Sequence, residues 1–425
     1  GNHATNFCGN LLRNPDIDYV VRGEGELSFA EFVTNMQDGK KDTDVIGVID
    51  RRKLSTGRSN ELSPMIERLD ELPISAFDLL DHEFYKNTVG ASLMFSRGCS
   101  FNCAFCASHT VHGRAIRFKT EERIMTEFGE LIDTYGFDRI VIEDDLFAAD
   151  KGLFLKIADR LSGTYGKIKF FLPQGLSVSI LDEEIIDAMI KMGIDEAAVA
   201  VESGSEYVQR HLIKKNVSFV KTRRILKYLR TKDFFIYVNF IFGFPGETKE
   251  LMRETIDFIN TIDVDWIYIF HALPLPGSEI YDQLAARGII NPDTFDWDGL
   301  RLGRRVFDTP EIGALELERL TYDTNINCNF LNNSNMRHHR YQRAIEVLNR
   351  VIIEPYPFHI VGLYCRGMAY LHLGDKKRAV ADFQNCADWV AKNEESGKLY
   401  NLYKDEMPNI EKYANSGVAA KTGGF

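Results

Sequence analysis

Apolar strand-like segments alternate with amphipathic helical segments over residues 91 to 271, and this alternation restricts the possible folds more than any other feature of the sequence. Parallel strands need long crossovers, usually helices, so the alternation predicts a parallel sheet, either an open barrel or a doubly wound sheet. Functional residues are then expected at the carboxyl ends of the strands. Six strands are predicted, at Ala91 to Ser96, Arg139 to Ile142, Phe170 to Pro173, Ala197 to Val201, Phe235 to Phe242 and Trp266 to His271.

The helices between these strands carry start and stop signals. The clearest one is predicted to follow an N-cap at Asp182 and to end before Gly193. Upstream, Ile17 to Arg22 reads as a strand that enters a helix through a turn at Gly23 to Gly25, and a short strand is expected near Val45 to Ile49.

Composition excludes several classes of protein. Hydrophobic residues make up 44% and charged residues 27% of the 425 residues, which excludes a disordered or fibrous chain. The net charge of −11 repels phosphate backbones, so no nucleic acid is expected as a partner. There is no signal peptide and no apolar run long enough to span a bilayer, so we expect a cytoplasmic protein without a membrane span.

After about residue 300 the strand-like segments end and a helical repeat follows. Tyr341 to Leu348 and Lys376 to Phe383 repeat at an offset of 35 residues, close to the tetratricopeptide (TPR) period of about 34. Gly367, Tyr370 and Gly374 stand at the small, aromatic and turn positions of such a helical hairpin. The repeat therefore predicts a TPR-like helical region.

Three of the seven cysteines, Cys99, Cys103 and Cys106, lie within eight residues directly after the first strand. An odd count with the others scattered favours a reducing compartment and one ligand cluster over a disulfide framework. Three thiolates at a strand end can hold a cubane cluster and leave its fourth iron open to a ligand. A structural zinc site is the alternative, because His109 and His112 are close enough to complete it.

The Cys-x3-Cys-x2-Cys spacing, with Phe105 directly before the third cysteine, resembles the radical S-adenosylmethionine (SAM) superfamily over roughly residues 86 to 300. The resemblance implies an α/β fold, a partial (β/α)6 TIM-like barrel, in which Cys99, Cys103 and Cys106 hold a 4Fe-4S cluster. The open iron would bind SAM, and an electron from the cluster would cleave it to a 5′-deoxyadenosyl radical. The resemblance also implies an electron donor such as flavodoxin or ferredoxin.

Segments at later strand ends are similar to further elements of that family. Glu143 to Phe147 resembles the Asp-Asp-x-Phe run of a cobalamin-associated branch, Val201 to Ser205 the Glu-Ser-Gly-Ser element, and Asn239 to Thr248 the Gly-x-Pro-Gly-Glu-Thr element. Leu273 to Ser278 resembles a Pro-Gly-Thr turn, and Lys214, next to Lys215, matches a base that pairs with the SAM carboxylate. The cofactor-binding residues implied in this way are Phe105, Glu143, Asp144, Glu202, Ser203, Lys214, Asn239, Gly243 and Leu273.

The N-terminal residues resemble the last part of the Rossmann-like cobalamin-binding domain that precedes the barrel in a branch of methylases and anaerobic cyclases. Gly1 to Thr5 and Asp18 to Glu26 carry this resemblance, which implies that His3 and Thr5 belong to a cobalamin site. The Asp-x-His-x-x-Gly motif of a lower axial histidine does not occur in the sequence. Cobalamin is therefore expected from the resemblance alone, and Gly1 would stand near the end of that domain.

We therefore expect a radical SAM enzyme that methylates an unactivated carbon of a small-molecule substrate with the help of cobalamin. Radical oxidation, rearrangement or cyclisation without methyl transfer is the alternative, and a non-catalytic TPR scaffold with a structural metal is the alternative from another class. Candidate catalytic residues are His109, Tyr237 and His271, which lie on the first loop or on late strands.

The expected domains follow from these assignments. They are the end of a cobalamin-binding domain (1–45), a linker (46–85), the radical SAM core (86–300), a second linker (301–316), a TPR-like region that offers a surface for a protein partner (317–395) and a tail (396–425), whose residues 414–425 are expected to be disordered.

Overall fold

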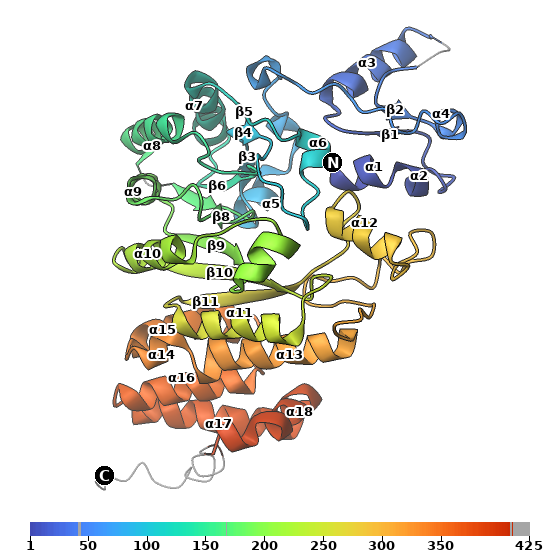
Figure 1. Cartoon of the computed structure of the whole chain (residues 1–425). Coiled ribbons are helices and arrows are strands. Elements are labelled where there is room, and N and C mark those ends of the chain that lie inside the picture. The colour runs from blue at the N-terminus through green and yellow to red at the C-terminus, as the bar shows by residue number, and fades with distance from the viewer. Residues whose placement is uncertain (41–43, 167, 409, 411–425) are drawn as a thin grey trace, which may run out of the picture.

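A computed structural model of the chain describes residues 1–40, 44–166, 168–408 and 410. An N-terminal segment, a core of strands and helices, and a stack of C-terminal helices follow one another along the molecule (Figure 1). The tail expected to be disordered, residues 414–425, lies outside the described residues. Among the helices that the structure describes, none is both long enough and apolar enough to cross a bilayer.

All six predicted strands are present, and they form two parallel sheets. The first sheet has the order β3-β6-β7 and the second β8-β9-β10-β11. A short strand after the third predicted one, β8, starts the second sheet, so the predicted barrel wall is divided there. The strands are β3 (Ala91–Leu93), β6 (Arg139–Ile142), β7 (Lys169–Phe171), β8 (Leu176–Ser177), β9 (Glu196–Glu202), β10 (Phe235–Phe242) and β11 (Trp266–His271).

Helices cover one face of these sheets, as Figure 1 shows for α8, α9 and α10. The predicted limits of α9 are confirmed: the Asp182 side chain accepts a hydrogen bond from Ile185 N at 2.9 Å, and Gly193 ends the helix with φ of 113°. A Cβ at Gly193 would overlap the carbonyl oxygen of Ile168, so the position requires glycine. The covering helices are α7 (Glu121–Gly129) with a π-helical turn η3 (Glu130–Thr134), α8 (Lys151–Tyr165), α9 (Glu183–Met192), α10 (Phe219–Arg230), α11 (Lys249–Thr261) and α12 (Glu279–Ala286).

The main core fills the space between the strands and these helices. Alternate strand residues, such as Val199, Val238 and Phe240, are fully buried against helix residues such as Ile186 and Met189. The period-2 alternation of strands sends the intervening residues to the other face, which is the concave inner face of the half-barrel.

The N-terminal segment is a small unit in which β1 pairs with β2 in the antiparallel direction. The strand expected near Val45 to Ile49 is present as β2, so the first part of the expected linker packs with the N-terminal segment. Its elements are α1 (Asn2–Asn6), α2 (Cys8–Leu11), β1 (Val20–Val21), α3 (Glu26–Gln37), β2 (Val48–Ile49) and α4 (Arg51–Ser55). The 3-10 turns η1 (Leu69–Glu71) and η2 (Phe77–Leu79) and the helix α5 (His82–Asn87) then lead to β3.

The C-terminal region is helical, as predicted, and it starts inside the expected second linker. The two repeated segments begin α15 and α17, and α16 and α17 pack as a hairpin in which Gly367 lies against Phe383. The elements are α13 (Ala314–Ile326), η5 (Asn327–Leu331), α14 (Ser334–Arg337), α15 (Tyr341–Leu348), η6 (Asn349–Ile353), α16 (Ile360–His372), α17 (Lys376–Lys392), α18 (Glu394–Tyr403) and η7 (Lys404–Glu406), of which η5 and η6 are π-helical.

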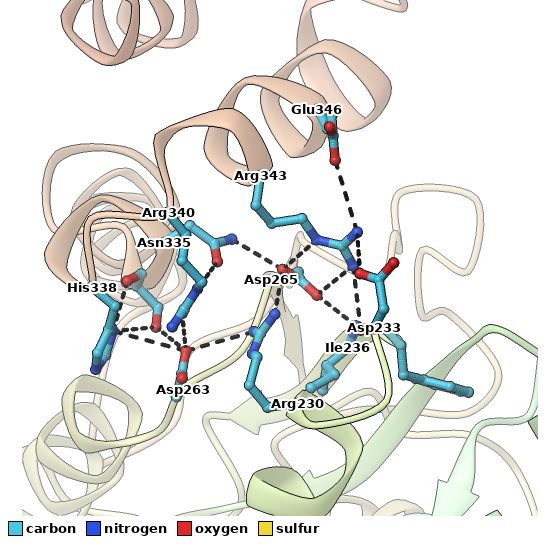
Figure 2. A network of polar contacts seen from close by, with 12 residues as sticks. Arg230, Asp233, Ile236, Asp263, Asp265, Asn335, His338, Arg340, Arg343 and Glu346 are labelled. Atoms are coloured by element: carbon cyan, nitrogen blue, oxygen red, sulfur yellow. Dashed lines mark hydrogen bonds and ion pairs between the residues drawn. The ribbon is translucent and has the colours of Figure 1, made fainter. Parts of the chain in front are cut away.

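A buried carboxylate joins this helical region to the base of the half-barrel (Figure 2). Asp265, directly before β11, accepts hydrogen bonds from Arg230 Nη1 at 2.9 Å, from Arg343 Nε at 3.0 Å and from Asn335 Nδ2 at 3.0 Å. The backbone N–H of Ile236 in β10 donates to it at 2.9 Å. Strand, barrel helix and C-terminal helices therefore meet on one side chain that is 0% exposed.

We predict that Asp265→Asn lowers the free energy of unfolding by about 3–5 kcal/mol, because it removes the one fully buried carboxylate charge that two partly buried arginines share. Thermal unfolding followed by circular dichroism measures the change. Asp233→Asn is the control: this carboxylate is 3.6 Å from Arg343 but 96% exposed, so its loss is expected to cost no more than about 0.5 kcal/mol. Equal effects of the two substitutions would contradict the role given to Asp265.

Candidate functional site

The three predicted ligand cysteines lie on one loop that is closed at its base. β4 (Ser96–Arg97) pairs with β5 (Arg117–Phe118), and the loop between them also carries the short helix α6 (His109–His112). Gly98 opens the loop with φ of 100°, where a Cβ would overlap the carbonyl oxygen of Ala115. The loop thus leaves the first strand in a turn that only glycine takes without strain.

Backbone hydrogen bonds tie the centre of this loop to the segments that follow two other strands. Ala104, between the first two thiols and the third, donates its N–H to Ile213 O and accepts from Ile280 N, both at 3.0 Å. Ile213 follows β9, and Ile280 follows β11. The cysteine loop therefore lies across the carboxyl edge of the second sheet, where parallel strands place functional residues.

The three sulfurs share one environment. Cys99, Cys103 and Cys106 are free and partly buried. Burial raises the pKa of Cys103 to about 12, and the neighbouring Cys106 and Cys99 contribute to the rise, while Lys215 opposes it. Burial, and then the nearby Cys106, also raise the pKa of Cys99. The thiols are therefore close enough to influence one another, and a metal centre would have to displace their protons. Within the described ranges, no three His, Cys, Asp or Glu side chains are close enough together to hold a single metal ion.

Two acids at the end of β6 hold the loop in place. Asp145 Oδ2 accepts from His112 Nδ1 at 2.8 Å and from Gly98 N at 3.1 Å. Asp144 is 2% exposed and accepts from Phe95 N at 2.9 Å and from Ser96 Oγ at 2.6 Å. Asp144 was expected to bind a cofactor, but its two oxygens are directed to the strand before the cysteine loop.

Glu143, the third acid of this run, lies on the inner face. Its nearest described partner is Gln174 Nε2 at 3.4 Å, and it lines a cavity of about 740 Å³ inside the half-barrel. The period-2 alternation explains the difference, because Glu143 and Asp144 leave the strand in opposite directions.

Glu202 ends β9 beside the cysteines and pairs with Lys215, the neighbour of the lysine predicted from the motif. Lys215 Nζ donates to Glu202 Oε1 and to the carbonyl oxygen of Ala200, both at 2.8 Å, and both charged side chains are buried. Lys214 instead pairs with Glu279 at 2.5 Å and is 39% exposed. The positive φ of 56° at Lys214 turns the chain there, which directs the following lysine inwards.

Ser203 is also turned away from the cysteines. It is 0% exposed, and its hydroxyl lies 2.9 Å from Thr255 Oγ1 of α11 and accepts from Ser205 N at 3.1 Å. The Ser203 side chain therefore fixes the turn after Glu202 to the neighbouring helix. The sequence predicts that Ser203 contacts a cofactor, but the hydrogen bonds of its hydroxyl go to Thr255 and Ser205.

The Gly-x-Pro-Gly-Glu-Thr segment after β10 surrounds a buried acid. Glu247 is 0% exposed, and its Oε2 accepts from Gly243 N at 2.7 Å and from Phe244 N at 3.1 Å, whereas its Oε1 has no hydrogen-bond partner among the residues that the structure describes. Arg305 Nη1 donates to the carbonyl oxygen of Gly243 at 3.0 Å, so the Arg305 side chain packs against this glycine. Burial raises the pKa of Glu247 to about 7.

The three candidate catalytic residues occupy different places. His109 is partly buried on α6, and burial lowers its pKa. Tyr237 lies on the inner face of β10 and lines a cavity of about 370 Å³ with Asn239. His271 points the other way: its Nε2 lies 2.8 Å from Thr321 Oγ1 of α13, and burial lowers its pKa to about 4. His271 therefore belongs to the packing of α13 and not to the inner face.

Two further predicted cofactor residues are Phe105, which lies on the cysteine loop itself, and Leu273, which lies in the turn after β11. Phe105 packs beside Phe244, with 6.1 Å between ring centroids. Leu273 is partly buried, and its carbonyl oxygen accepts from Leu275 N at 2.9 Å in the turn after β11. Both lie near the carboxyl edge of the second sheet.

The N-terminal segment reaches the cysteine loop through α1 and α6, which lie next to each other in Figure 1. Asn6 Nδ2 donates to Thr110 Oγ1 at 2.8 Å. His3 is exposed and stacks on Phe7 at 5.5 Å, while the buried Thr5 accepts from Gly23 N at 2.9 Å. Thr5 thus holds the turn that follows β1.

A buried ion pair that the sequence did not predict joins the two parts. Glu24, in the Gly-Glu-Gly-Glu turn, is fully buried and binds both terminal nitrogens of Arg117 at 2.7 Å. Arg117 lies on β5 and also donates to the carbonyl oxygens of Ile66 and His112. A cavity of about 420 Å³ lies beside the pair, between this turn and Arg97 with His112. Only the tertiary structure brings these residues together, because 93 positions separate Glu24 from Arg117.

The two adjacent lysines give a matched test of the site. We predict that Lys215→Met lowers the free energy of unfolding by about 3–5 kcal/mol, because Glu202 stays buried without a cation. Lys214→Met removes a partly exposed pair and is expected to cost at most about 1 kcal/mol. Urea unfolding followed by fluorescence measures both. A larger loss for Lys214→Met would contradict the assignment of Lys215 as the buried partner of Glu202.

The raised pKa of Glu247 makes the stability of the fold depend on pH. Because its folded pKa of about 7 lies above its ordinary value of 4.5, the folded state holds a proton that the unfolded state has lost between these pH values. The free energy of unfolding should therefore fall as the pH rises from about 4.5 to 7, by at most roughly 3 kcal/mol from this group. Glu247→Gln keeps an acceptor for the two backbone N–H groups and should flatten the fall. An unchanged slope in urea titrations at several pH values would refute this.

Comparisons with known proteins agree with this geometry. Residues 93–259 match the family described as the Radical SAM superfamily. An uncharacterized methyltransferase of Pyrococcus horikoshii is 30% identical over 300 residues, which cover 70% of this chain and 64% of the relative. The cytidylyl-2-hydroxyethylphosphonate methyltransferase of Streptomyces wedmorensis is 27% identical over 332 residues, which cover 69% of this chain and 61% of the relative. The chain thus spans less than two thirds of the length of either relative.

A solved structure shares the fold over almost the whole chain. The structure of OxsB, described as a cobalamin-dependent S-adenosylmethionine radical enzyme with aqua-cobalamin bound, has a TM-score of 0.61 at 15% identity and covers 98% of this chain and 70% of its own. At this identity the likeness shows the fold. The sequence match and the cysteine loop identify residues 93–259 as a domain of the radical SAM superfamily.

Proposed function

We propose that this chain provides the cluster-binding core of a radical SAM enzyme that methylates an unactivated carbon of a small-molecule substrate with the help of cobalamin. The observation that carries the proposal is the grouping of Cys99, Cys103 and Cys106 on one anchored loop at the carboxyl edge of a parallel half-barrel. The relatives and the shared fold support it, since two of them are described as methyltransferases and the third as cobalamin-dependent.

The donor set of the loop fits a 4Fe-4S cluster. Three thiolates with no fourth protein ligand leave one iron open, and each thiolate binds a different iron, so the sulfurs need not converge on one point. Of the two histidines that the zinc alternative offers as a fourth ligand, His112 is hydrogen-bonded through Nδ1 to Asp145. When bound and reduced, such a cluster supplies the electron that cleaves SAM.

Two residues of this chain, Lys215 and Glu202, would orient SAM. Lys215 uses two of its three N–H donors on described partners, which leaves one for an anionic group such as the SAM carboxylate. Glu202 holds this ammonium at the cysteine edge and, as an acceptor, is matched to a hydroxyl or amino group. Buried surroundings strengthen both interactions.

The N-terminal segment is suited to help hold cobalamin. Its Gly-Glu-Gly-Glu turn forms one wall of the cavity of about 420 Å³, and the cysteine loop forms the other through Arg97 and His112. A cofactor bound on that side would lie next to the loop that carries the cluster ligands. The fold shared with OxsB includes this segment, because the match covers 98% of the chain.

We further propose that the C-terminal helices are TPR-like, as the offset of 35 residues and the α16/α17 hairpin support. A flavodoxin or ferredoxin would supply electrons from outside. The seven free thiols support a cytoplasmic location, because an oxidising compartment favours disulfides.

Anaerobic purification of a single-cysteine variant tests the cluster. We predict that Cys103→Ala loses essentially all of the roughly four irons per chain and the brown absorption of the native protein. Cys328→Ala, which removes a buried free thiol of η5, is the control and should keep both. Iron and sulfide analysis with electron paramagnetic resonance measures the difference. A colourless native protein that contains zinc would overturn the proposal.

Anaerobic turnover with methyl-deuterated SAM tests the reaction. Methylation predicts a product that is heavier by a labelled methyl group in place of hydrogen, and mass spectrometry of product and 5′-deoxyadenosine detects it. An unmethylated product formed with stoichiometric 5′-deoxyadenosine would support radical oxidation, rearrangement or cyclisation and contradict methyl transfer.

A further inference from the structure

The inner face of the half-barrel carries aromatic side chains in register. Strand pairing places Asn239 of β10 beside Ala200 of β9 and Tyr268 of β11, and it places Tyr237 beside Ala198. Paired residues of neighbouring parallel strands point to the same face, so this row continues across the sheet. Small residues on β9 face large rings on β10 and β11, which leaves space above the alanines.

That space is a cavity of about 370 Å³ with aromatic walls. Tyr237 and Tyr268 are stacked at 5.3 Å, and Tyr268 and Phe270 at 6.0 Å. Tyr268 is 36% exposed and Phe171, on the opposite wall, 50%. Large rings that are this open on a concave face are suited to hold a flat apolar ligand between them.

Besides its tyrosines, this aromatic cavity is lined by three polar side chains, Asn239, Arg350 and Glu196. Asn239 Oδ1 is buried and has no hydrogen-bond partner in the described structure, so it is an unused acceptor. Arg350 lines both this cavity and the adjoining one of about 740 Å³. An unpartnered acceptor and a guanidinium at the border of an apolar space match a ligand that carries a donor and a negative charge.

Arg350 comes from the C-terminal helices and not from the half-barrel. It lies on η6 and is held by an ion pair from Nη2 to Glu196 at the start of β9 and by the ring of Phe235 at 4.7 Å. Among the described residues, the hydrogen-bonded ion pair of Arg350 uses Nη2, so the remaining N–H donors of the fork are available. The helical region therefore completes the floor of the barrel cavity with a positioned cation.

The cavity and the cysteine loop lie along the same strand. Ala198 and Glu202 are four residues apart on β9, which at a rise of about 3.3 Å per residue is roughly 13 Å. A ligand whose ring packs against Tyr237 and Tyr268 would therefore extend toward the edge where Glu202 and the cysteines lie. This distance suits a substrate whose reacting carbon is at the end remote from the Arg350 floor.

We infer that the substrate is a planar aromatic or conjugated molecule with a hydrogen-bond donor and an anionic group. Its rings bind against the row formed by Tyr237, Tyr268 and Phe270, its donor to Asn239 Oδ1, and its carboxylate, sulfonate or phosphate to Arg350. The assignment rests on the proposed function, which makes the barrel interior a substrate site. Arg350, and the C-terminal helical region that carries it, would then help to determine which substrate binds.

Two fluorescent dyes test the inference on the full-length chain without turnover. 1-Anilinonaphthalene-8-sulfonate has fused rings, an N–H donor and a sulfonate, and N-phenyl-1-naphthylamine has the same rings and N–H without the charge. We expect each dye to bind at one saturable site. Tyr268→Ala should weaken both dyes about tenfold or more, whereas Phe84→Ala, an exposed ring on α5, should change neither.

The charge is tested separately. Arg350→Gln should weaken the sulfonate dye about tenfold and the uncharged dye less than twofold. Arg253→Gln, an exposed arginine on α11, is the matched control and should weaken neither. Loss of both dyes to the same extent in Arg350→Gln, no effect of Tyr268→Ala, or no saturable site in the native protein would each overturn the inference. Because dye binding is measured without SAM, a negative result would overturn the substrate inference alone. The cluster and turnover tests of the proposed function would be unaffected.

Discussion

The parallel pairing of β9 with β10 and of β10 with β11 is the constraint on which the rest of the molecule depends. Because all three strands run in one direction, their carboxyl ends meet at one edge, and the loops that follow them can hold the cysteine loop. The same register sends Val199, Val238 and Ile267 to the helical side and leaves Tyr237 and Asn239 on the inner face. One hydrogen-bonding pattern thus sets the site, the core and the cavity.

Buried ion pairs then fix the two additions to the half-barrel. Glu24 binds Arg117 at the cysteine loop, and Asp265 binds Arg343 at the base (Figure 2). A buried pair of this kind adds little net stability, since desolvation offsets the attraction, but it strongly penalises any arrangement that separates the partners. These pairs therefore act on the orientation of the N-terminal segment and of the C-terminal helices more than on their stability.

The motif residues divide into those that face the site and those that hold its backbone. Glu202 lies beside the cysteines, whereas Ser203 and Asp144 bind neighbouring strands and helices. A motif records that residues occur together but not which side chains face a ligand. The direction in which the chain turns decides that, and at Lys214 a left-handed turn makes Lys215 the inner base.

The sequence by itself determined the six main strands and their parallel direction, the helix limits at Asp182 and Gly193, and the cysteine loop, because periodicity, caps and ligand spacing are local properties of the chain. Only the tertiary structure decided that β2 pairs with β1, that His271 faces α13, and that Arg350 forms the floor of the cavity. Those contacts join residues that are far apart in the chain. Their geometry depends on how whole elements pack, which no local pattern encodes.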